Sequence, residues 1–171
     1  MAKDGVQAAA WFRKATEQGY AEAQYNLGNS YRNGEGVAKD QAEAVKWYRK
    51  AADQGLAQAQ YNLGNCYLNG EGVAKDQAEA VKWWRKAAEQ GEVTAQHNLG
   101  VCYRDGEGVA KDEVEAYAYF NLASSTDEDA RNKRGMMEKG MSPNAISRGQ
   151  QRAKELQKEI EAKIAAKKAG K

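Results

Sequence analysis

The sequence AEAQYNLGNSYRNGEGVAKDQAEAVKWYRKAADQGL, residues 21–56, decides the fold, because residues 57–92 repeat it with only six changes. Residues 93–125 follow the same pattern with more substitutions, and residues 4–20 match its second half. Self-similarity at a period of 36 residues is typical of stacked repeat proteins, in which each unit contacts only its neighbours. The sequence therefore predicts one extended array rather than a compact globule.

Each unit is expected to form two helices. Residues 21–33 place small and apolar residues such as Leu27 and Gly28 on one face of a helix, here called helix A. After a glycine-containing loop, Asp40 stands where an N-cap belongs, and a second helix, helix B, ends before Gly55. Neither helix can bury its row of small and apolar residues alone, so the stacking of helices must create the core. The predicted fold class is all-α: an α/α superhelical solenoid of antiparallel helix pairs with a C-terminal capping helix.

The chain as a whole is read as a single solenoid domain. Its parts are expected to be a half repeat at 4–20, complete repeats at 21–56, 57–92 and 93–125, a divergent helix at 126–141 and a capping helix at 142–168. Ser142 followed by Pro143 reads as an N-cap with proline at the first helical position. The Lys- and Ala-rich end of the chain is expected to fray.

The repeated motifs resemble those of a known family. The pattern A-x-A-x-Y-N-L-G-x-x-Y-x-x-G-x-G-V-x-K-D, followed by A-V-x-W-Y-x-K-A-A-x-Q-G, is similar to the Sel1-like repeat and extends from Asp4 to about Arg152. The resemblance implies a relative of the tetratricopeptide repeat that serves as an adaptor for protein partners.

Tetratricopeptide repeats line a concave face with five positions of helix A, and the resemblance transfers these positions to this chain. The predicted partner-binding residues are Glu22, Tyr25, Asn29, Arg32 and Asn33 in the first complete unit, Gln58, Tyr61, Asn65, Leu68 and Asn69 in the second, and Thr94, His97, Val101, Arg104 and Asp105 in the third. Together they form a surface of apolar, amide and charged side chains that suits a peptide. A clamp for a C-terminal carboxylate is not expected. Such a clamp needs basic residues at the fifth residue of each unit, and Tyr25, Tyr61 and His97 stand there.

The bulk composition excludes several other classes of partner. With 26 basic and 24 acidic residues, the formal net charge of +2 gives no field that would attract nucleic acid. No run approaches the roughly 20 apolar residues that a membrane span needs, and the N-terminus lacks a signal-peptide core. A soluble monomer is expected, with the cytoplasm favoured and an exported form with a removed signal left open.

No catalytic, metal-binding or cofactor-binding residues are predicted. The loop Gly34-Glu35-Gly36 lacks the third glycine and the Lys-Ser/Thr ending of a phosphate-binding loop. The chain has one histidine, His97, and Cys102 lies five residues later, which on a helix places the two about 140 degrees apart. This spacing favours neither a catalytic dyad nor a zinc site.

The two cysteines, Cys66 and Cys102, occupy equivalent places in successive units, where Ser30 stands in the first. Equivalent positions lie about one helix-packing distance apart, roughly 9 or 10 Å, which exceeds the reach of a disulfide. They are therefore expected to be free, buried thiols. In this respect the chain departs from the cysteine-rich branch of Sel1-like proteins, in which a pair of cysteines cross-links each repeat.

Three functional hypotheses remain open at this stage. The first is a non-catalytic adaptor that holds a peptide or protein surface on the concave helix A face. The second is β-lactam or peptidoglycan-related binding or hydrolysis, as proposed for the cysteine-rich branch. The third is a designed or consensus repeat scaffold without a native partner, which the near-identity of two units suggests.

Overall fold

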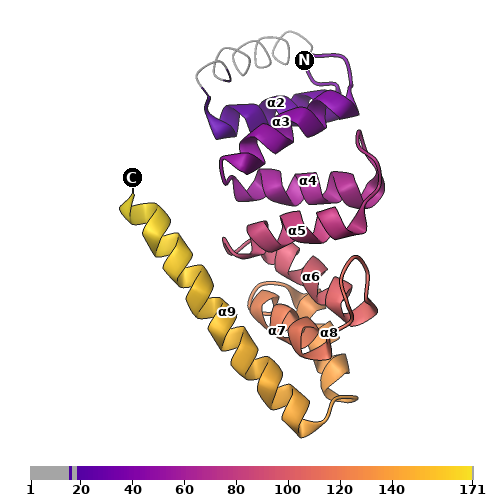
Figure 1. Cartoon of the computed structure of the whole chain (residues 1–171), viewed down its shortest axis with the longest axis vertical. Coiled ribbons are helices and arrows are strands. Elements are labelled where there is room, and N and C mark those ends of the chain that lie inside the picture. Colours follow the sequence, from indigo (N-terminus) through magenta and orange to yellow (C-terminus); the bar gives the residue numbers. More distant parts are fainter. Residues whose placement is uncertain (1–15, 17–18, 171) are drawn as a thin grey trace. The chain divides into compact units, whose positions relative to one another are not determined.

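The computed structural model of the chain describes residue 16 and residues 19–170. Every regular element in this part is an α-helix, which confirms the all-α prediction (Figure 1). The helices are α2 (Ala21–Asn33), α3 (Gln41–Asp53), α4 (Ala57–Asn69), α5 (Gln77–Ala88), α6 (Val93–Asp105), α7 (Glu113–Ala123), α8 (Glu128–Glu138) and α9 (Pro143–Ala169). Helices α2, α4 and α6 are the A helices, and α3, α5 and α7 the B helices. The half repeat expected at 4–20 lies almost wholly outside the described residues.

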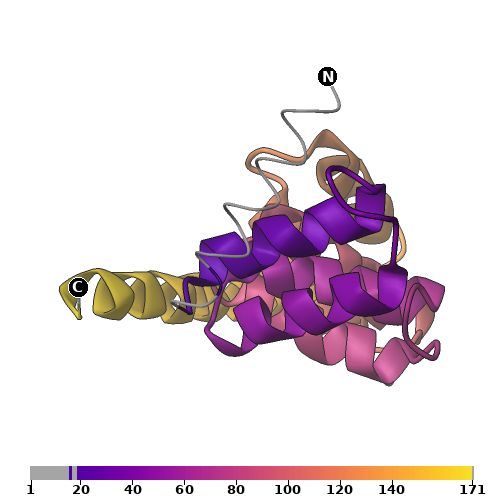
Figure 2. The ribbon, with the colours of Figure 1, turned by 90° about the horizontal axis from the view of Figure 1, so that it is seen from above.

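The described chain forms two compact units, divided between Trp83 and Trp84 within α5. The first unit contains α2, α3, α4 and most of α5, and the second contains the end of α5 and α6 to α9. In the first unit α2 and α3 lie side by side as an antiparallel pair, which the view in Figure 2 shows from above.

The helix ends follow from the cap residues of the sequence. Asp40 precedes α3, and its side chain accepts a hydrogen bond of 3.0 Å from the backbone N–H of Glu43. Gly34 ends α2 in the left-handed conformation with φ 77°, and its N–H donates to the carbonyl of Ser30. The N–H of Asp40 then donates to the carbonyl of Tyr31 at 2.9 Å, which closes the loop. The same caps and loop closures recur after α4 and α6.

Helix A and helix B of one repeat approach closely because a glycine on helix A faces an aromatic ring on helix B. A Cβ atom built on Gly28 would lie 2.7 Å from Cδ1 of Tyr48, and one built on Gly100 would lie 2.7 Å from Cδ1 of Phe120. Both rings are fully buried. The Tyr48 hydroxyl also donates a hydrogen bond of 2.7 Å to Oδ1 of Asn29.

Each helix B is joined to the next helix A by two kinds of polar contact. Arg49 on α3 donates to the hydroxyl of Tyr67 on α4, with its guanidinium 5.6 Å from the ring centroid. The side chain of Gln60, which is buried, donates at 3.0 Å to the carbonyl of Ala52 at the C-terminal end of α3. The same carbonyl also accepts from the backbone N–H of Gly55 at 2.9 Å, so the buried amide adds a further hydrogen bond at the end of α3.

The same two contacts occur in the second unit. Arg85 donates to the hydroxyl of Tyr103 at 2.7 Å, and buried Gln96 donates to the carbonyl of Ala88 at 3.3 Å. Each of these residues lies 36 positions after its counterpart in the first unit. The contact between consecutive helices is therefore repeated along with the sequence.

The capping helix α9 packs on α7. It begins at Ser142, whose hydroxyl accepts from the N–H of Ala145 at 3.2 Å, and Pro143 is its first residue. Its buried residues are Ala145, Gly149, Ala153, Leu156 and Ile160. The ring of Tyr117 on α7 fills the space that a side chain at Gly149 would need, since a Cβ there would lie 2.6 Å from Cδ1 of the ring.

The end of α9 differs from the sequence-based expectation. The helix continues through Ala169 rather than fraying, because its last turns have partners at the end of α5. The ammonium of Lys163 lies 2.7 Å from a carboxylate oxygen of Glu89, and that of Lys167 donates to the side chain of Gln90 at 2.8 Å. Both contacts join residues more than 70 positions apart.

The glycine–aromatic contact gives a stability prediction. Gly28→Ala and Gly100→Ala should each lower the free energy of unfolding by about 1–3 kcal/mol, because the new methyl group overlaps a buried ring. Gly135→Ala, inside α8, is the matched control: nothing lies within 4 Å of its Cβ, so the substitution should raise stability by about 0.5–1 kcal/mol. Denaturant unfolding of the three variants tests this, and equal effects at all three positions would contradict it.

Candidate functional site

The fifteen residues predicted to bind a partner are here called the helix A face. All fifteen are exposed or half-buried, and none is buried. The opposite stripe of the same three helices is buried, and it contains Ala23, Leu27, Ala59, Leu63, Ala95 and Leu99. The helices therefore present the predicted residues on their accessible sides.

In the first unit, part of the face also supports the core. The ring of Tyr25 lies with its centroid 5.9 Å from that of Tyr48, and its hydroxyl accepts a hydrogen bond of 3.4 Å from Asn62. Asn29 is the acceptor for the Tyr48 hydroxyl. Substituting Tyr25 or Asn29 would thus disturb folding as well as any binding.

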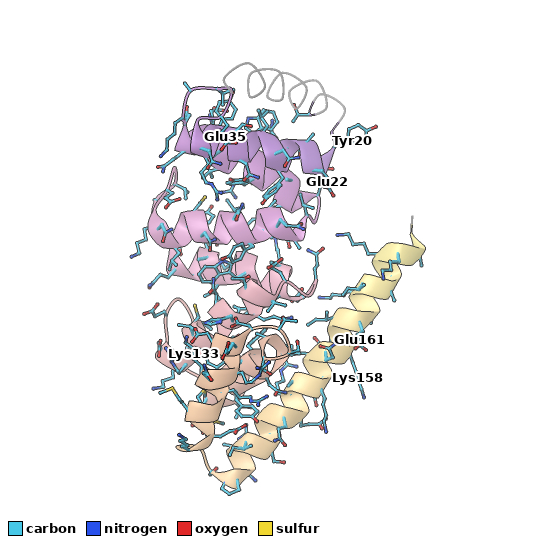
Figure 3. The ribbon with its side chains drawn as sticks, turned by 180° about the vertical axis from the view of Figure 1, so that it is seen from behind. Tyr20, Glu22, Glu35, Lys133, Lys158 and Glu161 are labelled. Carbon is cyan, nitrogen blue, oxygen red and sulfur yellow. The ribbon has the colours of Figure 1, made fainter. Side chains whose placement is uncertain are left out.

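The ends of α2 and α4 are more exposed. Glu22 and Gln58 stand at the equivalent position in the first turns of α2 and α4, and both are exposed. Glu22 and Glu35 mark opposite ends of α2 in Figure 3. Asn33 and Asn69 donate to the carboxylates of Glu35 and Glu71 in the following loops, at 3.0 and 3.2 Å.

The middle of the face combines several types of side chain. Arg32 and Leu68 are half-buried at equivalent positions of α2 and α4, and Tyr61 and Asn65 are half-buried on α4. Nε of Arg32 lies 3.4 Å from Oδ1 of Asn33, the next residue. The middle of the face on these two helices therefore carries an aromatic ring, an aliphatic side chain, an amide and a guanidinium, each half-buried.

In the second unit, α8 and the residue before it contact part of the helix A face. Nδ1 of His97 lies 2.6 Å from an oxygen of Asp127, and its Nε2 lies 3.4 Å from an oxygen of Asp129. The edge of the imidazole also contacts the ring of Phe120. Val101 packs against the small core cluster that includes Phe120 and Ala130. These two residues hold α8 in place, a role that the sequence analysis did not predict.

The remaining residues of α6 are more accessible. Thr94 is exposed, and Arg104 makes a paired contact with its neighbour Asp105, with the closest atoms 2.6 Å apart. This contact lowers the pKa of the Asp105 carboxyl. The charges of Arg104 and Asp105 therefore largely cancel on this helix.

The sequence analysis also missed ion pairs between distant parts of the second unit. Arg152 of α9 lies 2.7 Å from a carboxylate oxygen of Glu115 on α7. Arg134 of α8 donates to the side chain of Asn121 at 2.7 Å. No repeat pattern relates these residues, so periodicity could not have found them.

The prediction of free, buried thiols is confirmed, because Cys66 and Cys102 are both free and only 4% and 5% exposed. Burial raises the pKa of each thiol to about 11. Among residue 16 and residues 19–170, no three His, Cys, Asp or Glu side chains gather as they would around a metal ion. None of the helices in this range combines the length and apolar content of a membrane-spanning segment.

Comparison with known proteins relates the chain to one family. The model of the Sel1 repeat matches residues 1–20, 21–56, 57–92 and 93–125. A protective antigen of uropathogenic Escherichia coli, which displays an SLR fold, is 43% identical with a TM-score of 0.79, and the match covers 94% of this chain and 34% of that one. A Sel1 repeat protein from Oxalobacter formigenes is 37% identical with a TM-score of 0.74, covering 90% and 65%.

A third structure, cysteine rich protein B of Helicobacter pylori, is 25% identical with a TM-score of 0.61, and the match covers 77% of this chain and 96% of that one. No curated protein matches the chain. The chain spans about a third of the length of the Escherichia coli antigen and 65% of the Oxalobacter protein.

The buried thiols should react slowly with a water-soluble thiol reagent in the native protein and completely after unfolding. At neutral pH a pKa near 11 leaves at least about a hundredfold less thiolate than an exposed cysteine has. Cys66→Ser should change the melting temperature little, because Ser30 is buried at the equivalent position. Rapid labelling of two thiols in the native protein would contradict the prediction.

The docking of α8 should weaken in acid. Burial alone would raise the pKa of Asp127, but hydrogen bonds from the N–H of Ala130 and from His97 outweigh burial and lower the pKa. The ionised carboxylate therefore stabilises the fold above its ordinary pKa of about 3.9, and this stability is lost as pH falls below that value. Asp127→Asn should cost about 1 kcal/mol at pH 7, and this difference from the wild type should shrink towards pH 3.

Urea unfolding at several pH values measures this effect. Asp76→Asn is the matched control, because Asp76 also accepts from the backbone at the start of a helix, at 3.0 Å, but no contact with a histidine is seen in the described part of the chain. A difference between wild type and Asp127→Asn that stays constant with pH would contradict the lowered pKa, and an equal pH dependence in the two variants would show that the histidine contact contributes nothing.

Proposed function

Because the chain belongs to the Sel1 repeat family, we propose that it is a non-catalytic adaptor that binds a peptide or a partner protein's surface through its helix A face. The helical repeats of this family commonly mediate protein–protein interaction. The observation that carries the proposal is that all fifteen residues of the face remain accessible while the opposite stripe of the same helices is buried.

The proposed contact is concentrated on α2 and α4. On α6, His97 and Val101 already bind α8, and Arg104 is paired with Asp105. On α4, by contrast, Gln58 is exposed and Leu68 is half-buried. These side chains can change their surroundings on binding without breaking a described contact of the fold.

The side chains on α2 and α4 suit a peptide better than a highly charged partner. Leu68 and the ring of Tyr61 offer apolar area, which supplies most of the affinity in peptide grooves. The exposed amide of Gln58 can bind the peptide backbone, and Arg32 adds one cation. A mixed surface of this kind favours a partner that contributes apolar anchors and main-chain hydrogen bonds.

The non-catalytic part of the proposal is supported by the state of the two cysteines. A nucleophilic cysteine needs a lowered pKa and access to solvent, whereas burial raises the pKa of Cys66 and Cys102 to about 11. The alternative, β-lactam hydrolysis of the kind proposed for cysteine-rich relatives, is tested with a chromogenic β-lactam. We expect no turnover above that of buffer.

The adaptor proposal is tested with variants of α4. A partner is first captured from a cell extract, and its dissociation constant is then measured for the wild type and for Gln58→Ala combined with Leu68→Arg. The fold should tolerate arginine at this position, because Arg32 and Arg104 occupy it in the other repeats. The double variant should bind the partner about tenfold or more weakly, since a central apolar contact is lost.

The matched control combines Lys46→Gln with Lys82→Gln. Both lysines lie on B helices with side chains 66% and 63% exposed, and neither belongs to the helix A face. The control should bind as the wild type does. An equal loss in both double variants, or no loss in the α4 variant, would refute the assignment of the face.

A further inference from the structure

A second surface lies in the second unit, between the C-terminal end of α7 and the middle of α9. Here the structure forms an open groove of about 540 Å³. The α7 side contributes Asn121, Leu122 and Ser125, and the α9 side contributes Ala153, Lys154 and Lys158. Lys158 is labelled on α9 in Figure 3. None of these residues belongs to the helix A face.

The two edges of α9 differ in how their charges are satisfied. On one edge, Arg152 pairs with Glu115 and Lys163 pairs with Glu89, each at 2.7 Å. On the groove side, Lys154 and Lys158 are exposed, and neither forms an ion pair with any carboxylate in the described part of the chain. The groove thus has two cations whose charge the described fold does not neutralise.

On the α7 side of the groove, two arginines of α8 bind residues at the C-terminal end of α7. Arg134 donates to Oδ1 of Asn121 at 2.7 Å, and Arg131 donates to the backbone carbonyl of Ser124 at 2.8 Å. No carboxylate lines the groove.

Two acidic residues lie nearby, each with a partner of its own. Glu161 accepts from the amide of Gln157 at 2.8 Å, and Glu138 lies 3.5 Å from Nε of Arg134. The side chains that line the groove therefore carry two positive charges, those of Lys154 and Lys158, and none of these lining residues is acidic.

The floor of the groove is apolar. Leu122 is half-buried and Ala153 is 3% exposed, so a side chain entering the groove would meet methyl groups. Lys154 and Lys158 are four residues apart on one helix, a rise of about 6 Å. Carboxylates four residues apart on a helix lying alongside α9 have the same spacing, as in the charged edges of paired helices.

We propose that this groove binds an acidic amphipathic helix of a partner protein, which places an apolar side chain on Leu122 and Ala153 and carboxylates beside Lys154 and Lys158. The groove complements such a helix in both charge and polarity. The interaction is independent of the helix A face, because the two surfaces share no residue. A chain with both surfaces could hold two protein segments at once.

The test uses two labelled peptides of about 18 residues, long enough to form a helix. One carries leucine along one face with glutamate along the adjacent edge, and the other has glutamine in place of every glutamate. Fluorescence anisotropy with the full chain at low salt should show the glutamate peptide binding about fivefold or more tightly. The preference should decline as salt is added.

Lys154→Glu combined with Lys158→Glu should abolish this preference. Lys46→Glu combined with Lys50→Glu is the matched control, because it reverses the same number of charges at the same spacing on α3. The control should keep the preference, with circular dichroism confirming that both variants fold. Loss in both variants would show that only net charge matters and would overturn the proposal.

Two further probes distinguish the class of partner. Vesicles containing anionic lipid and a single-stranded oligonucleotide should bind no better to the wild type than to Lys154→Glu with Lys158→Glu. Binding of either probe that depends on these lysines and exceeds that of the glutamate peptide would overturn the assignment to an acidic protein helix. Equal binding of the glutamate and glutamine peptides would overturn it as well.

Discussion

The close approach of helix A to helix B depends on one contact, the insertion of an aromatic ring against a glycine. Tyr48 on Gly28 and Phe120 on Gly100 repeat this contact in the two units. Because a Cβ at either glycine would overlap the ring, the distance between the helices is set by the absence of a side chain on one of them. The same contact orients helix A, since its glycine must face helix B; of the predicted binding residues, Tyr25 and Asn29 then also reach Tyr48, while Glu22 and Asn33 at the helix ends stay exposed.

The sequence was sufficient to predict the fold, because its features act locally. The cap at Asp40, the glycine that ends α2 at Gly34, and the stripe containing Leu27 each depend on residues within one or two turns. They recur every 36 residues, so an error in one unit would have been visible in the next. In the first repeat, α2 spans the predicted range 21–33, and α3 follows Asp40 and ends before Gly55, as predicted.

The contacts of the last two helices could not be predicted in this way. His97 meets Asp127 across 30 residues, and Arg152 meets Glu115 across 37, and in each pair one residue lies beyond the last matched repeat. The register of α9 on α7, set by Gly149 against Tyr117, is likewise not periodic. The groove beside Lys154 lies between these two helices, so its shape was not visible in the sequence.

The link from each helix B to the following helix A has a consequence for how such a chain can lengthen. Arg49 with Tyr67 and Arg85 with Tyr103 are the same pair, 36 residues apart, and Gln60 and Gln96 repeat the accompanying bond to a carbonyl. A gene segment encoding one unit can therefore be duplicated in frame, and the new copy meets both neighbours with bonds that already exist. The two adjacent units that differ at only six positions are thus already joined by contacts that an inserted copy would reproduce.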